Sequence, residues 1–168
     1  MYHEIFGQMS KQLGQLDLWL DAAAAYAKDK KIEPATILNY RLAADQFALV
    51  RQIQIACDTA KLGASRLTGK DAPNHADTEQ TFEEVHARIH AVRDYLGTLS
   101  AADFATTATR VITQPRWEGK VMSGADYFLE HVVPNFFFHV TTSYAILRHI
   151  GLPLGKRDYL GTLSQRMP

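Results

Sequence analysis

The sequence predicts an all-α fold, a four-helix bundle in a single domain over residues 1–168. Apolar residues recur at alternating steps of three and four in four long segments, which is the period of an amphipathic helix. The connections between these segments are long enough for a crossover, as bundles allow. A chain of 168 residues also has enough interior for one hydrophobic core.

The first helix is predicted from an apolar stripe that continues for about six turns near the amino terminus. Its members are Phe6, Met9, Leu13, Leu16, Leu20, Ala23 and Ala27. Residues 32–41 then contain a proline and restart the pattern only briefly. We therefore expect a connection with a short helix there.

The second helix is predicted from about Leu42 to Leu67, where the turn-forming stretch TGKDAPN follows. Its stripe consists of Leu42, Leu49, Ile53, Cys57 or Ala56, Ala60, Ala64 and Leu67. Cys57 is the only cysteine, so no disulfide can form within the chain. Its place in an apolar stripe favours a small core residue over a reactive thiol.

The third helix is predicted from a start near Thr78, with the stripe Phe82, Val85, Ile89, Val92, Leu96 and Leu99. Thr78 is a plausible N-cap, but Thr81 stands three residues later, where a capping box needs Glu or Gln. Residues 100–122 do not keep a helical period and contain Pro115 and Gly119. They predict a small hairpin or an irregular excursion before the last helix.

The fourth helix is predicted from a cap at Ser123 to about Ile150, with Gly151 and Pro153 as its stop. Its stripe is Leu129, Val132, Phe136, Val140, Ser143 and Leu147. Pro134 lies inside this helix, lacks a backbone donor and pushes against the carbonyl of Glu130, so we expect a kink or break. Residues 152–168 are rich in turn residues and are expected to cross the surface.

Composition excludes several classes of partner. Lys and Arg together number 18, as do Asp and Glu, and no concentrated basic patch interrupts this balance. We therefore expect no nucleic acid or anionic membrane as partner. No stretch approaches the roughly 18 uninterrupted apolar residues of a membrane span. The segment MYHEIFGQMSKQLG also lacks the pattern of a signal peptide, so a cytoplasmic protein is expected.

The pair Asn135 and His139 is the first candidate site, because a spacing of four places both on one helical face. Two interpretations stand. The pair could offer two ligands to one metal ion, which would then need a third ligand from a facing helix. It could equally be a polar inclusion in the bundle, with Asn135 bonded to the carbonyl that Pro134 leaves free.

The second helix offers the facing polar residues Gln52, Gln54 and Asp58. Gln54 is expected to be at least half buried, and amides are weak ligands for zinc compared with imidazole or carboxylate. Ser143, four residues after His139, is either a nucleophile beside a base or a small residue of the stripe. We expect a polar pocket around His139, Asn135 and Gln54, with Gln52, Asp58 and Ser143 near it.

A second histidine pair, His86 and His90, has better ligand chemistry, since two imidazoles at this spacing can chelate one ion. The same helix face carries Glu83, Arg93 and Asp94, and no His-Glu-x-x-His motif accompanies the pair. Coincidence, with adventitious metal binding at most, is the favoured interpretation.

Three consecutive phenylalanines, residues 136–138, cover three directions around the last helix. At least one should face away from the core, into a subunit interface or a pocket. Because exposed apolar groups favour association, we expect a homodimer.

The stretch HVTTSYAILRHIGLPLG resembles the end of the last helix in the DinB-like superfamily of four-helix bundles. In that superfamily a ligand histidine is followed by a Leu-Arg pair and by a glycine twelve residues later, as His139, Leu147-Arg148 and Gly151 are here. The longer stretches EHVVPNFFFHVTTSYAILRHIGLPLGKRDYLG and RLAADQFALVRQIQIACDTAK look like one of its families of unknown function. The resemblance implies the bundle fold and a tendency to dimerise.

The resemblance also implies a metal site that this sequence departs from. The superfamily uses two histidines four apart on the last helix, and the first of these positions is Asn135 here. A third histidine is expected on the second helix, but none occurs between Tyr40 and Asn74, and Gln52 or Gln54 stands nearest. Only His139 remains, so the thiol-dependent transfer or hydrolysis ascribed to the superfamily does not carry over.

Two functional hypotheses follow. In the first, the chain is a bundle of unknown function that has lost most metal ligands and binds a small molecule or a partner without catalysis. In the second, it is a divergent metal-dependent enzyme of the thiol-transferase or hydrolase type, with zinc or nickel held by His139, Asn135 and Gln54.

Overall fold

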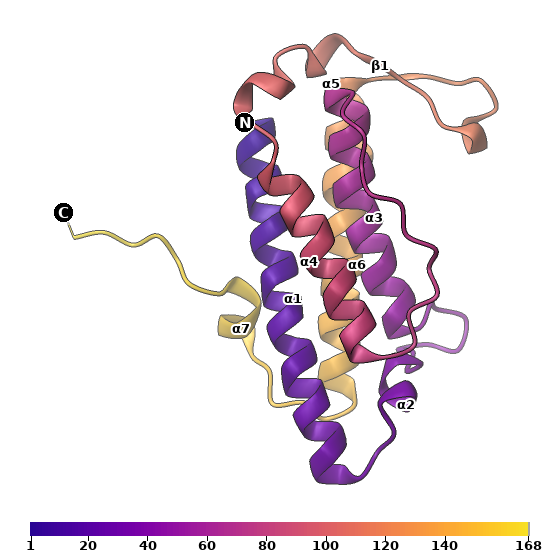
Figure 1. The fold of residues 1–168 in the computed structure, drawn as a ribbon, viewed down its shortest axis with the longest axis vertical. Helices are drawn as coiled ribbons and strands as arrows, with labels where there is room; N and C mark the ends of the chain where they lie inside the picture. Colours follow the sequence, from indigo (N-terminus) through magenta and orange to yellow (C-terminus); the bar gives the residue numbers. More distant parts are fainter. Residues whose placement is uncertain (168) are drawn as a thin grey trace.

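The computed structural model describes residues 1–167, and four long helices dominate it (Figure 1). These are α1 (Tyr2–Lys30), α3 (Leu49–Thr68), α4 (Phe82–Gly97) and α6 (Val133–His149). A short helix α2 (Pro34–Leu38) lies in the first connection, as the sequence predicts. The all-α bundle and the four segments that form it are therefore confirmed.

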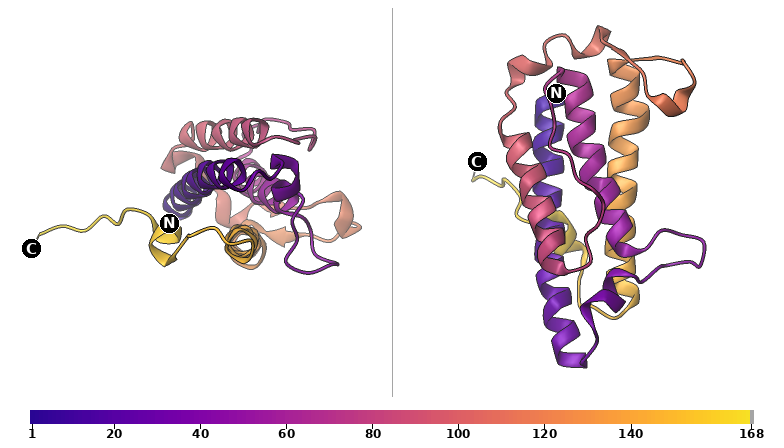
Figure 2. Two further views of the ribbon diagram at one scale, coloured as in Figure 1. Left: turned by 90° about the horizontal axis from the view of Figure 1, so that it is seen from below. Right: turned by 45° about the vertical axis from the view of Figure 1, so that its right-hand side comes forward.

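The connection after α3 runs back along the length of the bundle before α4 begins, as Figure 1 and the right-hand view of Figure 2 show. Helices α3 and α4 therefore run in the same direction, and α1 and α6 run against them. The connection between α3 and α4, residues 69–81, is therefore the crossover that the sequence predicts. Contacts are most extensive between α3 and α6 and between α1 and α4.

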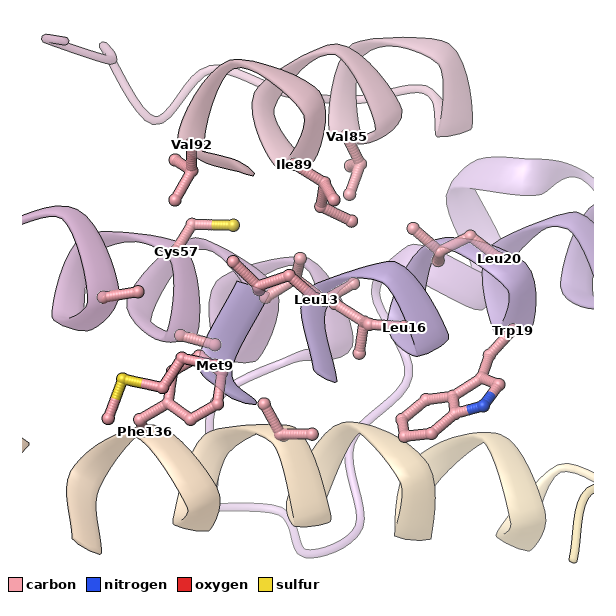
Figure 3. Close-up of a cluster of buried hydrophobic side chains, with 14 of the residues drawn as sticks. Met9, Leu13, Leu16, Trp19, Leu20, Cys57, Val85, Ile89, Val92 and Phe136 are labelled. Atoms are coloured by element: carbon pink, nitrogen blue, oxygen red, sulfur yellow. The ribbon is translucent and has the colours of Figure 1, made fainter. Parts of the chain in front are cut away.

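The core forms where the apolar stripes of the four helices meet (Figure 3). Leu13, Cys57, Ile89 and Phe136 each come from a different helix, and none is exposed to solvent. Burial raises the pKa of the Cys57 thiol to about 12. The interpretation of Cys57 as a small core residue is thus confirmed.

Helix α3 begins at Leu49 and not at Leu42, so the predicted start is wrong. Residues 39–48 form a loop closed by the Leu49 amide, which donates to the Tyr40 carbonyl at 2.9 Å. Leu42 precedes Leu49 by the equivalent of two helical turns, but its side chain is 45% exposed. Its agreement with the stripe is therefore coincidental.

Helix α4 begins at Phe82, with Thr81 rather than Thr78 as its N-cap. The Thr81 hydroxyl accepts from the Glu84 amide at 3.2 Å, and the Glu84 carboxylate accepts from the Thr81 amide at 3.1 Å. This is a complete capping box, which fixes the first turn of the helix. The predicted start near Thr78 is thus wrong by one turn.

The predicted excursion is a small hairpin with 3₁₀ turns that crosses one end of the bundle (Figure 1). Strand β1 (Val111–Ile112) pairs antiparallel with β2 (Met122–Ser123). Three 3₁₀ turns accompany them, η1 (Ala101–Phe104), η2 (Thr107–Thr109) and η3 (Pro115–Trp117). The excursion meets the next helix at Gly124, where an added Cβ would lie 1.9 Å from the Thr107 carbonyl oxygen. Only glycine allows this close approach.

The last long helix is entered through two short elements, α5 (Gly124–Asp126) and a π-helical turn, η4 (Tyr127–Val132). Ser123 caps α5 as predicted, since its hydroxyl accepts from the Asp126 amide at 3.1 Å. The expected irregularity at Pro134 appears as the π turn directly before it. The wider turn changes the phase of the stripe, so Phe128 is buried while Leu129 is 59% exposed, against the prediction.

The carboxyl-terminal segment folds back onto α1 and includes a short helix, α7 (Lys156–Leu160). The ring of Tyr159 stacks on Trp19 with 5.7 Å between centroids, and Trp19 Nε1 donates to the Asp158 carbonyl at 3.3 Å. The predicted course over the surface is confirmed up to residue 167, and Pro168 lies outside the described residues. Within residues 1–167, none of the helices has the length and apolar character needed to cross a bilayer.

Candidate functional site

His139 lies on the face of α6 that packs against α3, and it is 7% exposed. Its Nδ1 stands 2.6 Å from Oε1 of Gln52. The Gln52 amide nitrogen in turn donates to the Phe47 carbonyl at 3.0 Å, which fixes the orientation of the amide. Because the amide oxygen can only accept, Nδ1 carries the proton and Nε2 keeps its lone pair.

Burial lowers the pKa of His139 to about 4, and the nearby positive charge of Arg51 adds to the effect. The imidazole is therefore neutral at neutral pH. Ser143, one turn later, is fully buried, and its hydroxyl donates to the backbone carbonyl of His139 at 2.8 Å. Its proton is directed to the backbone rather than to the imidazole.

Asn135 lies one turn before His139 and also faces α3. Its Nδ2 donates to the hydroxyl of Thr59 at 2.7 Å. Thr59 and Gln52 are seven residues apart and therefore share one face of α3. The structure thus brings Asn135 and His139 together with Thr59 and Gln52, and no sequence pattern singled out Thr59.

Gln54 and Asp58 find their hydrogen-bond partners on a different side of α3 from His139, although Asp58 also lines the groove beside Asn135. The amide nitrogen of Gln54 donates to Glu79 at 2.8 Å, and Asp58 accepts from Arg88 at 2.7 Å. Their hydrogen bonds therefore lead toward α4 and the crossover segment. The structure does not bring Gln54 and Asp58 together with His139.

The side chains around Arg88 form a buried charge cluster between α3, α4 and residues 69–81. Arg88 is 2% exposed and donates to Asp58 at 2.7 Å, to Asp77 at 2.6 Å and to Glu79 at 2.9 Å. Burial alone would lower the pKa of Arg88, but the hydrogen bonds and charges of Glu79, Asp58 and Asp77 raise it above its ordinary value. This arrangement holds the crossover segment against the bundle.

The donor set around His139 fits a metal ion poorly. It offers one imidazole, the two amides of Gln52 and Asn135 and the hydroxyl of Thr59, and these polar groups already bond one another in pairs. Zinc and nickel prefer imidazole, thiolate or carboxylate ligands. This donor set therefore does not support metal chemistry at His139.

A groove of about 340 Å³ opens beside Asn135 and Thr59. Helix α3 forms one wall, the π turn and the start of α6 form the other, and residues 114–116 of the excursion lie at its edge. Its charged and imidazole side chains are Arg51, Asp58, Arg66, Arg116 and His131.

The arginines of this groove differ in their partners. Arg51 pairs with Asp77 at 2.6 Å. Arg66 donates to the hydroxyl of Tyr127 at 2.9 Å, and Arg116 donates to Nε2 of His131 at 2.7 Å. Among residues 1–167, neither Arg66 nor Arg116 forms an ion pair with a carboxylate. Burial lowers the pKa of His131, and the charges of Arg116 and Arg66 add to the effect, so the ring is neutral at neutral pH.

Two buried polar atoms in the same groove lack a partner in the described chain. They are the amide nitrogen of Gln114, a side chain that is 7% exposed, and Nδ1 of His131. Since Nε2 of His131 accepts from Arg116, Nδ1 carries the proton in the neutral ring. Both atoms are therefore donors, and buried donors are normally satisfied.

The pair His86 and His90 meets a third side chain, Asp17 of α1. Asp17 lies 2.6 Å from Nδ1 of His86 and 2.9 Å from Nε2 of His90. One ligand atom from each residue lies within 4.8 Å of the other two, close enough to bind one metal ion. Asp17 is not recognisable from the sequence, because no local pattern shows which residue of α1 faces α4.

Comparisons with known proteins agree with this fold. A family model described as "Domain of unknown function (DUF1993)" matches residues 1–160. The crystal structure of a DinB family member protein from Shewanella denitrificans is similar, with a TM-score of 0.93 and 51% sequence identity over 97% of this chain and 93% of that chain. No curated protein matches the sequence. The expected kinship with a family of unknown function among DinB-like bundles is confirmed.

Proposed function

Since the chain belongs to the DUF1993 family, whose function is unknown, we propose that it binds a small anionic molecule in the groove beside Asn135. The observation that carries the proposal is the pair Arg66 and Arg116, whose partners in the groove are a tyrosine and a histidine rather than carboxylates. Arginines that line a concave site without an acidic partner are suited to carboxylate or phosphate groups.

The balance of charge in the groove supports an anion. Asp58 is the only carboxylate among the lining residues. It is already engaged by Arg88 at 2.7 Å and by Lys61 at 3.0 Å. The positive charges of Arg66 and Arg116 therefore remain available to a ligand.

The other lining groups indicate an organic anion of modest size. Gln114 and His131 offer two donors that lack acceptors among residues 1–167. Ile55, Leu62 and Tyr127 supply an apolar part of the wall. A volume of about 340 Å³ lies at the lower end of the range for small-molecule sites. The proposal is one of binding, with no catalytic step.

The test is a thermal-shift and calorimetric titration with inorganic phosphate, citrate and adenosine monophosphate as probes. At least one probe should raise the Tm of the wild type, because a ligand that binds only the folded state stabilises it. The double variant Arg66→Gln/Arg116→Gln should lose the shift. Arg157→Gln, an exposed arginine on α7, is the matched control and should keep it. A wild type that responds to none of these anions contradicts the proposal.

The alternative, a divergent metal-dependent enzyme of the thiol-transferase or hydrolase type, makes a different prediction. Tag-free wild type would then carry stoichiometric zinc or nickel that His139→Ala loses. The amide and hydroxyl ligands around His139 argue against this result. If it is found, the protein should be assayed with thiol cofactors, and the metal-free binding function is overturned.

We further propose that the chain forms a homodimer through the outer face of α6. Phe138 is 56% exposed and Leu42 is 45% exposed, and both line an apolar groove of about 430 Å³ together with Phe137 and Pro134. A second copy of the chain is the proposed occupant, since an apolar patch of this kind favours association.

A further inference from the structure

Asp17, His86 and His90 lie between α1 and α4, whereas His139 faces α3. The two histidines are four residues apart and point from one face of α4. Helix α1 packs along that helix, and Asp17 is the residue that it places opposite the pair. The carboxylate reaches both imidazoles at once, one through each oxygen, at 2.6 and 2.9 Å.

The three side chains are sheltered unequally. Asp17 is 16% exposed and His86 is 20% exposed, while His90 is 56% exposed. A shallow polar groove lined by Ser10, Arg93 and Asp94 opens next to His90. An ion could therefore reach the site from solvent without movement of the helices.

The donor set suits a first-row transition metal. Two imidazoles and one carboxylate are ligands that zinc and nickel accept, and three protein ligands leave a further position for water. This set is chemically stronger than the amides and single imidazole around His139. The spacing of ligand atoms, within 4.8 Å of one another, agrees with a shared ion.

Asp21 lies behind His86, where it can hydrogen-bond the ring nitrogen that does not face the metal position. Its carboxylate lies 3.5 Å from Nε2 of His86. If Nδ1 of His86 gives its lone pair to a metal, the ring proton resides on Nε2, where Asp21 can accept it. A carboxylate behind a ligand histidine is the usual arrangement in metal sites, since it fixes the ring tautomer.

We propose that Asp17, His86 and His90 form a binding site for a divalent transition metal of the zinc and nickel class, which links α1 to α4. The site is independent of the anion groove beside Asn135. Because a metal bound there would hold the folded arrangement of two helices, it also stabilises the bundle.

The test is calorimetric titration of the tag-free full chain with zinc chloride or nickel chloride alone. The wild type should bind one equivalent of metal. His90→Gln and Asp17→Asn should each weaken binding at least tenfold, and both should abolish the rise in Tm that metal causes in the wild type. His149→Gln is the matched control, because His149 is an exposed histidine at the end of α6.

His90→Gln is the decisive variant, since an exposed side chain can be replaced without loss of the fold; circular dichroism confirms the helical content. A wild type that binds no metal in the submillimolar range overturns the proposal. Undiminished binding in His90→Gln overturns it as well. Binding that only His139→Ala removes would assign the metal to α6 instead.

Discussion

At His139, a position where the resemblance implies a metal ligand, the structure has a neutral imidazole bonded to an amide. Gln52 accepts from Nδ1 at 2.6 Å, and Thr59 accepts from Asn135 at 2.7 Å. Helices α3 and α6 are joined here by these two polar side-chain pairs. Each pair satisfies buried groups that would otherwise be costly.

Gln52→Leu should destabilise the fold. The substitution keeps the volume of the side chain but leaves the buried Nδ1–H of His139 without an acceptor, which costs about 1–3 kcal/mol. Urea denaturation followed by circular dichroism measures the loss. Gln8→Leu, at an exposed position on α1, serves as the control and should change stability by less than about 0.5 kcal/mol. Equal stability of the two variants would mean that the His139–Gln52 bond contributes nothing.

The lowered pKa of His139 predicts a range of pH in which the free energy of unfolding decreases on acidification. In the unfolded chain the imidazole takes up a proton below about 6.5, whereas in the folded chain it does so only near a pKa of about 4. Between these values the unfolded state binds more protons, so stability falls as the pH falls, by at most about 3 kcal/mol. Above this range of pH the effect is absent.

The measurement is the free energy of unfolding of wild type and His139→Gln from pH 7 to pH 4. Burial also lowers the pKa values of His75 and His131, so the wild-type curve alone does not isolate His139. The difference between the two curves should shrink as the pH falls. A constant difference would contradict the depressed pKa.

The candidate site could be read from sequence only in part. Asn135 and His139 are visible because they share one helix at a fixed spacing. Thr59, Arg66 and Asp17 are not visible, because their roles depend on which helices are neighbours. The expectation for Gln54 shows the limit, since it is buried as predicted but faces the Arg88 cluster rather than His139.

Apolar periodicity predicts all four long helices but not all of their ends. The stripe of α3 extends by coincidence to Leu42, and a periodic pattern alone cannot show where a loop replaces a helix. The start of α4 was available in the sequence, since Thr81 and Glu84 have the capping-box spacing. The phase of the apolar stripe before Pro134 could not be predicted from the sequence, because a π turn shifts it.

The crossover segment, residues 69–81, should depend on Arg88. In Arg88→Met the carboxylates of Asp58, Asp77 and Glu79 lose their shared partner, and breaking a buried ion cluster in this way costs about 3–5 kcal/mol. We expect faster cleavage within residues 69–81 in limited proteolysis, together with a lower midpoint of urea denaturation.

Arg51→Met is the matched control from the same cluster. Arg51 also pairs with Asp77, but its side chain is 40% exposed, and such pairs contribute about 1 kcal/mol or less. Asp77 keeps its bond to Arg88 in this variant. Equal protease sensitivity in both variants would show that the buried arginine does not hold the segment.

The proposed homodimer depends on the exposed apolar side chains on the outer face of α6. Light scattering at micromolar concentration should give the mass of a dimer for the wild type. Phe138→Asp places a charge in the apolar groove and should shift the mass to that of a monomer. Leu163→Asp, at an exposed position in the carboxyl-terminal segment, should leave the dimer intact. A monomeric wild type would refute the dimer.

The single buried thiol, Cys57, allows transient opening of the bundle to be measured by chemical labelling. Cys57 lies where the helices meet, has no solvent exposure and has a pKa of about 12, so a thiol-reactive reagent cannot modify it in the closed molecule. Each modification therefore requires the bundle to open, and the rate of labelling reports the free energy of that opening. A ligand in the anion groove or a metal between α1 and α4 would slow this labelling, which allows either site to be screened without knowledge of any reaction.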